Sequence, residues 1–124
     1  MAVKRLTLIG TGLIGASVGL AAKRAGIRVA GWDPDASAVA VAAERGALDD
    51  PADSLEAALA GADLAVVASP IGTLPAQVVA VLAAAGEQTT VTDVGSTKAS
   101  VIEAAAGSFD RWEIGLVDVI EVRG

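Results

Sequence analysis

Three glycines near the N-terminus, Gly10, Gly12 and Gly15, place the strongest constraint on how this 124-residue chain can fold. The apolar run over residues 4–9 has the composition of a buried β-strand. Residues 13–25 are apolar or small almost throughout and are followed by another glycine, which is typical of a helix and its C-terminal stop. The chain is therefore expected to pass from a strand through a tight turn into a helix at the three glycines.

The rest of the chain alternates short apolar runs with helix-like segments. Strands are expected over residues 4–9, 27–32, 62–68, 90–94 and 112–122. Helices are expected over residues 13–25, from Asp35 or Ser37 to Arg45, from Ser54 to Leu59, from Thr73 or Leu74 to Ala85, and from Ser96 or Thr97 to Ala106. Strands that alternate with helices through short loops indicate a parallel sheet with helices on both faces. Since crossovers are right-handed, we predict a doubly wound, Rossmann-type α/β fold.

The spacing Gly-x-Gly-x-x-Gly between a strand and a helix is typical of a dinucleotide-binding turn. The first glycine allows the tight turn, the second lets the backbone approach a pyrophosphate because it has no Cβ atom, and the third lets the helix lie against the sheet. The first N–H groups of the helix have no intrahelical acceptors and can donate to phosphate oxygens. The residues expected to bind the cofactor here are Gly10, Thr11, Gly12, Leu13, Ile14 and Gly15.

Asp33 follows the second predicted strand, where a carboxylate would accept hydrogen bonds from the hydroxyl groups of the adenosine ribose. Its charge would repel the 2′-phosphate of NADP, and residues 34–43 contain no Arg or Lys that could bind that phosphate. The pattern therefore favours NAD as the cofactor. The structural alternative is that the glycines only form turns and that Asp33 only caps backbone groups.

The composition disfavours several other classes of function. The net charge of −6 makes nucleic-acid binding unfavourable. The absence of cysteine excludes disulfides and thiolate metal sites, and no metal site is expected. Uncharged runs over residues 6–22 and 64–86 have the length of a signal peptide or a membrane span, but glycines or prolines interrupt both. We expect interior segments of a soluble, cytoplasmic protein.

The longer motif over residues 10–17, Gly-Thr-Gly-Leu-Ile-Gly-Ala-Ser, resembles the nucleotide-binding domain of prephenate dehydrogenases. Residues 68–71, Ala-Ser-Pro-Ile, resemble the family's turn that passes the adenosine and nicotinamide ribose. Residues 93–98, Asp-Val-Gly-Ser-Thr-Lys, resemble its D-x-G-S-x-K segment beside the nicotinamide and the substrate. The resemblance implies that the cofactor site also includes Ser69, Pro70, Ile71 and Asp93.

The activity that this resemblance implies is the NAD-dependent oxidative decarboxylation of prephenate or arogenate in tyrosine biosynthesis. Ser96 matches the family serine that forms a hydrogen bond near the reacting hydroxyl, and it is the catalytic residue expected in this chain. Alternatively, Ser96 caps the helix that follows, and the two roles are compatible. Lys98 is expected to support the same loop structurally.

The chain departs from the family pattern in its last residues. The family continues into a segment whose histidine accepts the substrate's hydroxyl proton, followed by a helical domain that contacts the substrate, but this sequence contains no histidine. Residues 109–124 form an atypical tail that is expected to add a strand, and a strand at a sheet edge could pair with a second copy. We therefore expect residues 1–124 to form a dinucleotide-binding domain that is catalytically incomplete alone.

Two alternatives remain open at this point. The first is a nucleotide-binding or sensing module whose output is a change of conformation or assembly. The second is the cofactor domain of another hydroxyacid dehydrogenase or of an imine reductase. The D-x-G-S-x-K segment favours the prephenate family over the second alternative, whereas the missing histidine strengthens the first.

Overall fold

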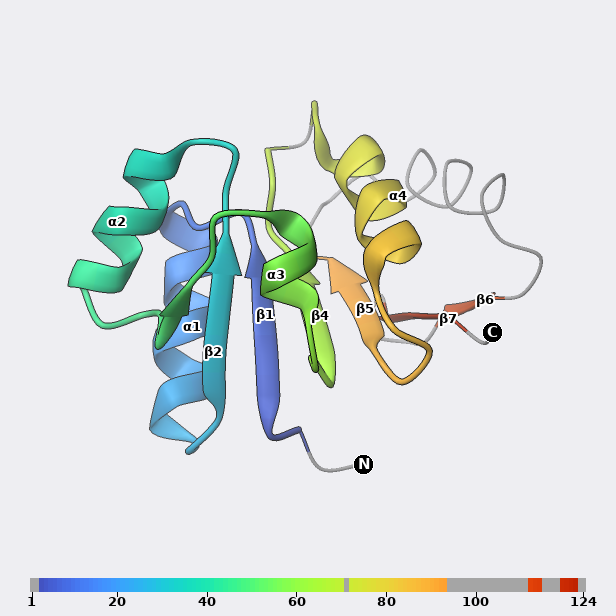
Figure 1. Ribbon diagram of the computed structural model, residues 1–124, viewed down its shortest axis with the longest axis horizontal. Helices are drawn as coiled ribbons and strands as arrows, with labels where there is room; N and C mark the ends of the chain where they lie inside the picture. The colour runs from blue at the N-terminus through green and yellow to red at the C-terminus, as the bar shows by residue number, and fades with distance from the viewer. Residues whose placement is uncertain (1–2, 71, 94–111, 115–118, 123–124) are drawn as a thin grey trace.

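The computed structural model describes residues 3–70, 72–93, 112–114 and 119–122. They contain a sheet with the strand order β3-β2-β1-β4-β5-β7-β6 (Figure 1). The parallel strands are β1 (Arg5–Ile9), β2 (Arg28–Trp32), β3 (Asp50–Pro51), β4 (Leu64–Val67) and β5 (Thr90–Asp93). Beyond β5, the strands β7 (Val119–Val122) and β6 (Trp112–Ile114) are antiparallel to their neighbours.

Helices follow the strands where the sequence predicts them, and side-chain caps fix two of their starts. They are α1 (Leu13–Arg24), α2 (Ala36–Glu44), α3 (Leu55–Leu59) and α4 (Leu74–Ala84). Asp35 caps α2 by accepting a hydrogen bond from the Ser37 N–H, and Ser54 caps α3 by accepting one from the Ala57 N–H. Both caps agree with the sequence analysis.

The strands alternate their side chains between two apolar cores, one on each face of the sheet. On one face Ile9 and Val67 pack with residues of α3 and α4, and the side chains of this core are almost fully buried. On the other face Leu8 and Val66 pack with residues of α1 and α2. Two buried faces covered by different helices confirm the predicted doubly wound Rossmann-type fold.

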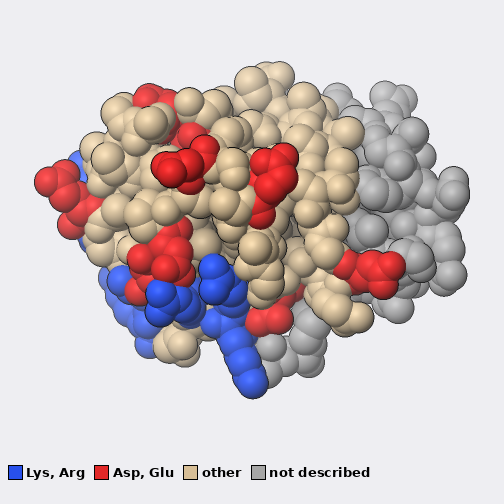
Figure 2. Space-filling view, in the orientation of Figure 1, with Lys and Arg blue, Asp and Glu red and all other residues tan. Residues whose placement is uncertain are grey.

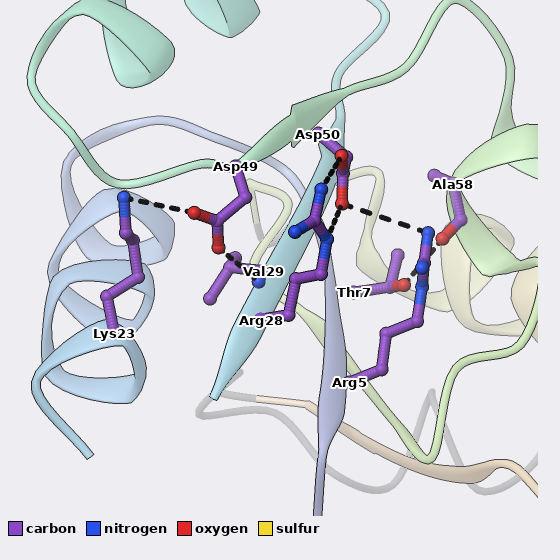
Figure 3. Close-up of polar contacts among 8 residues, drawn as sticks. All are labelled: Arg5, Thr7, Lys23, Arg28, Val29, Asp49, Asp50 and Ala58. Atoms are coloured by element: carbon purple, nitrogen blue, oxygen red, sulfur yellow. Dashed lines mark hydrogen bonds and ion pairs between the residues drawn. The ribbon is translucent and has the colours of Figure 1, made fainter. Parts of the chain in front are cut away.

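A network of charged side chains lies at the end of the sheet where the parallel strands begin (Figure 3). Arg28 makes two hydrogen bonds of 2.7 Å to the Asp50 carboxylate, and the Arg5 Nη2 atom lies 3.9 Å from the same carboxylate. Lys23 pairs with Asp49 at 3.3 Å. On the face drawn in Figure 2, Lys and Arg side chains gather at this end, interspersed with acidic ones.

Two details of the sheet differ from the expectation. The segment 112–122 is not one strand but two, β6 and β7, and the change in apolar phase between Leu116 and Val117 falls between them. The two-residue strand β3 was not predicted.

The helix expected from Ser96 or Thr97 to Ala106 lies outside the described residues. Within the described part of the chain, no helix is long and apolar enough to span a membrane.

Candidate functional site

The glycine turn lies where the order of the strands reverses. From β1 the chain continues to β2 and β3 on one side, whereas β4 and β5 lie on the other side of β1. In open parallel sheets, ligands bind in the crevice at the carboxyl ends of the strands at such a switch point. Gly10 follows β1 and Ala68 follows β4, so both lie at this position. The Ala68 N–H donates to the Ile9 carbonyl at 2.7 Å, which holds the two loops together.

Close backbone contacts explain two of the three glycines. Gly10 has a φ of +96°, and a Cβ atom there would lie 2.7 Å from the Ala68 carbonyl carbon. A Cβ atom on Gly15 would overlap the carbonyl oxygen of Gly10 and lie 3.5 Å from the Ala68 Cβ atom. The third glycine therefore brings the first turn of α1 against the glycine turn itself, as well as against the loop after β4.

The first turn of α1 presents free donors and open space. A Cβ atom on Gly12 would meet nothing within 4 Å, and no side chain caps this helix. Among the described residues, the N–H groups of Leu13 and Ile14 have no acceptor. The side chains of these two residues are 80% and 60% exposed. This surface can therefore donate hydrogen bonds to an anion and cover an apolar part of a ligand.

Asp33 lies against the glycine turn, as the sequence predicts. Its Oδ2 atom accepts a hydrogen bond of 2.8 Å from the Thr11 N–H, and its Oδ1 atom accepts one of 2.9 Å from the Asp35 N–H. The Gly10 N–H donates to the Trp32 carbonyl at 2.9 Å. The structural alternative of the sequence analysis is thus present in the fold, since Asp33 does cap backbone groups.

Asp35 is a residue that the sequence analysis used only as a helix cap. Hydrogen bonds from the Ser37 hydroxyl and the Ser37 N–H hold the pKa of its carboxyl below the ordinary value. The fold therefore places the Asp33 carboxylate beside the turn and a second carboxylate, that of Asp35, two residues further along at the start of α2, where it is ionised at neutral pH. The sequence feature that indicates this second carboxylate is the tripeptide Asp-Pro-Asp after the second predicted strand.

The turn and the loop after β4 each contain a buried hydroxyl oxygen without a hydrogen-bond partner in the described part of the chain, on Thr11 and on Ser69. The Thr11 residue is only 4% exposed. Pro70 is exposed, and its carbonyl accepts hydrogen bonds from the N–H and the hydroxyl of Thr73. Buried hydroxyls rarely lack a partner, so these two mark places where a ligand or a small rotation supplies one.

Asp93 ends β5 opposite Val67 of β4 and is 6% exposed, at the same edge of the sheet as the turn. The predicted site residues Ile71 and Ser96 lie outside the described residues, as does Lys98. Within the described ranges, no group of acidic side chains is arranged to hold a metal ion.

Comparison with known protein families identifies the family of this chain. Residues 18–114 match the family described as "Prephenate dehydrogenase, nucleotide-binding domain". The chain belongs to this family. The match begins after the glycine turn, so it rests on segments other than the motif that first indicated nucleotide binding. No curated protein matches the chain.

Solved structures with the same fold include several dehydrogenases. An arogenate dehydrogenase from Synechocystis has a TM-score of 0.77 at 26% identity, covering 86% of this chain and 38% of that one. A prephenate dehydrogenase from A. aeolicus, in complex with hydroxyphenyl propionate and NAD+, has a TM-score of 0.72 at 21% identity, covering 88% and 41%. A 3-hydroxyisobutyrate dehydrogenase from Mycobacterium tuberculosis has a TM-score of 0.68 at 25% identity, covering 86% and 37%. The chain spans about two-fifths of the length of these proteins.

Proposed function

We propose that this nucleotide-binding domain binds NAD(H) and serves a dehydrogenase that acts on prephenate or arogenate in tyrosine biosynthesis in the cytoplasm. The observation that carries the proposal is the first turn of α1 at the sheet's switch point. There the N–H groups of Leu13 and Ile14 lack acceptors, and the missing side chain of Gly12 leaves open space beside them. This arrangement suits a pyrophosphate, which supplies acceptors and needs close backbone approach.

Different residues of the site contact different parts of the dinucleotide. The two free N–H groups donate to the pyrophosphate, supported by the positive end of the helix dipole. Asp33 accepts hydrogen bonds from the adenosine ribose. Its carboxylate has room for them, because it has about four acceptor positions and accepts only two hydrogen bonds within the described fold. Ser69, Pro70, Ile71 and Asp93 line the path toward the nicotinamide.

Electrostatics favour NAD over NADP. Asp33 and Asp35 both follow β2, where the 2′-phosphate of NADP would lie, and both oppose a second negative charge. The nearest basic residue after them is Arg45, at the opposite end of α2. A phosphate at the ribose would therefore be desolvated without a cation to pair with it.

For the reaction, bound NAD supplies the acceptor of the hydride that leaves the substrate. Ser96 donates or accepts a hydrogen bond near the reacting hydroxyl. Since the sequence contains no histidine, the chain has no group that matches the family's proton acceptor. The 124-residue chain is therefore expected to bind the dinucleotide without turning over prephenate, and rapid formation of NADH from prephenate and NAD would contradict this assignment.

Titration with NADH and NADPH tests the proposal directly. Trp32 precedes Asp33 and is one of two tryptophans, so a Trp112→Phe variant makes the fluorescence report on Trp32 alone. We expect NADH to quench this fluorescence at concentrations at least about fivefold lower than NADPH, because one unfavourable charge contact at close range costs about 1 kcal/mol or more. Equal affinities would remove the role given to the carboxylates, and no binding of either would overturn the proposed function.

A second candidate function is nucleotide sensing, which needs only the nucleotide site at the first turn of α1. It predicts that NADH changes the conformation or the assembly state of the chain. Analytical ultracentrifugation with and without NADH distinguishes it from a cofactor domain, for which the sedimentation coefficient stays the same.

A further inference from the structure

We propose that Asp33 is a positioning residue that fixes the glycine turn before any ligand binds, in addition to contacting the ribose. Its effect on ligand affinity rests on the proposed function, whereas its effect on the turn does not. The proposal starts from the hydrogen bond of 2.8 Å between the Thr11 N–H and the Asp33 carboxylate.

This bond extends the pairing of β1 with β2 beyond the end of both strands. Ile9 and Trp32 are the last register partners of the two strands. The next N–H, on Gly10, donates to the Trp32 carbonyl at 2.9 Å. The N–H after that, on Thr11, donates to the side chain of Asp33 instead of to a backbone carbonyl. The carboxylate thus adds one more bond between the segments that follow β1 and β2, at the point where the chain turns.

No other side chain in the described part of the protein accepts a hydrogen bond from an N–H group of residues 10–15. Thr11 is 4% exposed, so water cannot readily replace a lost acceptor. The Thr11 hydroxyl has no hydrogen-bond partner among the described residues, so it does not hold the turn in place of that bond. Since Gly10 tolerates the left-handed backbone region at little cost, the glycine does not restrict the turn to one conformation by itself. The bond to Asp33 selects the observed conformation.

The second oxygen of the same carboxylate ties the turn to α2. It accepts the Asp35 N–H at 2.9 Å, and the Asp35 side chain in turn accepts hydrogen bonds from the N–H and the hydroxyl of Ser37. A charged acceptor makes each of these bonds stronger than a neutral one. Asp33 therefore bridges the turn that would bind a pyrophosphate and the start of the next helix. This preorganises the site, so that less ordering is required when the ligand binds.

Amide hydrogen exchange in the ligand-free protein tests the effect on the turn. Asp33→Ala removes both acceptors, and Asp33→Asn leaves one carbonyl oxygen that can serve only one of the two N–H groups. We expect exchange at the Thr11 amide to accelerate about tenfold or more in Asp33→Ala and less in Asp33→Asn. Exchange at the central Leu8 and Val66 amides, which follows global stability, changes less. Glu44→Gln, at the far end of α2, is the matched control for loss of one negative charge and leaves Thr11 unchanged.

Ligand binding separates positioning from ribose recognition. The probes are NADH and an NADH analogue whose adenosine ribose lacks both hydroxyl groups. If Asp33 positions the turn, Asp33→Ala lowers the affinity for the analogue as well, by about tenfold. If Asp33 acts only on the ribose, Asp33→Ala leaves the affinity for the analogue unchanged, and that result overturns the inference while the proposed function stands. If the unsubstituted chain binds neither probe, the proposed function fails, and unchanged exchange at Thr11 would still overturn the inference by itself.

Discussion

Arg5 and Arg28 are direct register partners on neighbouring parallel strands, and the carboxylate of Asp50 lies within 4 Å of both guanidinium groups (Figure 3). Two like charges on adjacent strands oppose the pairing of β1 with β2. Asp50 offsets this repulsion from the start of β3, with its closer bonds to Arg28. The pairing of three strands thus converges on one carboxylate, at the end of the sheet away from the candidate site.

The arrangement predicts that Arg28 and Asp50 are coupled in a double-mutant cycle. In the unsubstituted protein, Arg28→Gln lowers the free energy of unfolding because it removes the ion pair. In an Asp50→Asn background the same substitution destabilises the protein less, because Arg28 then repels Arg5 and keeps only its weaker attraction to Asp49. Urea unfolding of the four variants measures the coupling. The difference shrinks in 1 M salt, where charges at this exposed end are screened over about 3 Å. Equal effects of Arg28→Gln in both backgrounds would contradict the bridging role.

The acidic side chains also predict how stability depends on pH. Hydrogen bonds from backbone N–H groups, of Val29 to Asp49 and of Lys4 and Arg5 to Asp63, hold the pKa of both carboxyls below the ordinary value. A lowered pKa in the folded state means that the unfolded chain binds more protons in acid, so stability falls as the pH falls. We expect the urea midpoint to change little from pH 7 to about pH 5 and to fall below about pH 4. Asp63→Asn flattens this dependence, and a midpoint that rises in acid would contradict the assignment.

Two of the three glycines of the turn, Gly12 and Gly15, predict different outcomes for the same substitution to alanine. Gly15→Ala places a methyl group on the Gly10 carbonyl oxygen and is expected to lower the free energy of unfolding by roughly 1–3 kcal/mol, despite the better helix propensity of alanine. Gly12→Ala places its methyl group in open space and changes stability by less than about 1 kcal/mol. It reduces NADH affinity by about tenfold or more, because the methyl group occupies space beside the free N–H groups. Equal stabilities of the two variants, or unchanged NADH binding by Gly12→Ala, would count against this geometry.

Thr7 provides a prediction for the core that does not involve the site. Its hydroxyl donates at 2.5 Å to the carbonyl oxygen of Ala58 in the last turn of α3, and the residue is fully buried. Thr7→Val has nearly the same shape but leaves that carbonyl without a donor, so we expect a loss of about 1–3 kcal/mol in the free energy of unfolding. Thr7→Ser retains the hydroxyl and is expected to cost about 1 kcal/mol for the lost methyl group. A valine variant as stable as the native protein would show that water or a shifted helix replaces the bond.

The elements with strong local signals were predictable from the sequence. Apolar runs predicted the central strands, and Asp35 and Ser54 at the starts of α2 and α3 identified helices because a cap is set by neighbouring residues. The glycine spacing and Asp33 also predicted which segments meet at the site. The family match, over residues 18–114, confirms the nucleotide-binding domain inferred from residues 10–17, 68–71 and 93–98.

The features that escaped prediction depend on distant parts of the chain. The strand β3 has two residues and thus no periodicity, and it exists because Asp50 and Pro51 pair with Ala30 and Gly31. The antiparallel strands β6 and β7 were expected as one strand because two short apolar runs in succession differ from one long strand only in their pairing. Likewise, the hydrogen bond from the Thr11 N–H to Asp33 joins residues on different loops, and no local pattern reveals which N–H group donates to the carboxylate.

The position of β1 between β2 and β4 has a consequence for synthesis on the ribosome. The face of β1 that carries Leu8 can be covered once α1, β2 and α2 have emerged, all within the first third or so of the chain. The opposite face, with Ile9, is covered only in part by α3 until Leu64–Val67 and then α4 leave the exit tunnel. A nascent chain paused between these stages presents a half-built sheet with one apolar side incompletely covered, which is the species that chaperones bind and that aggregates when they are scarce.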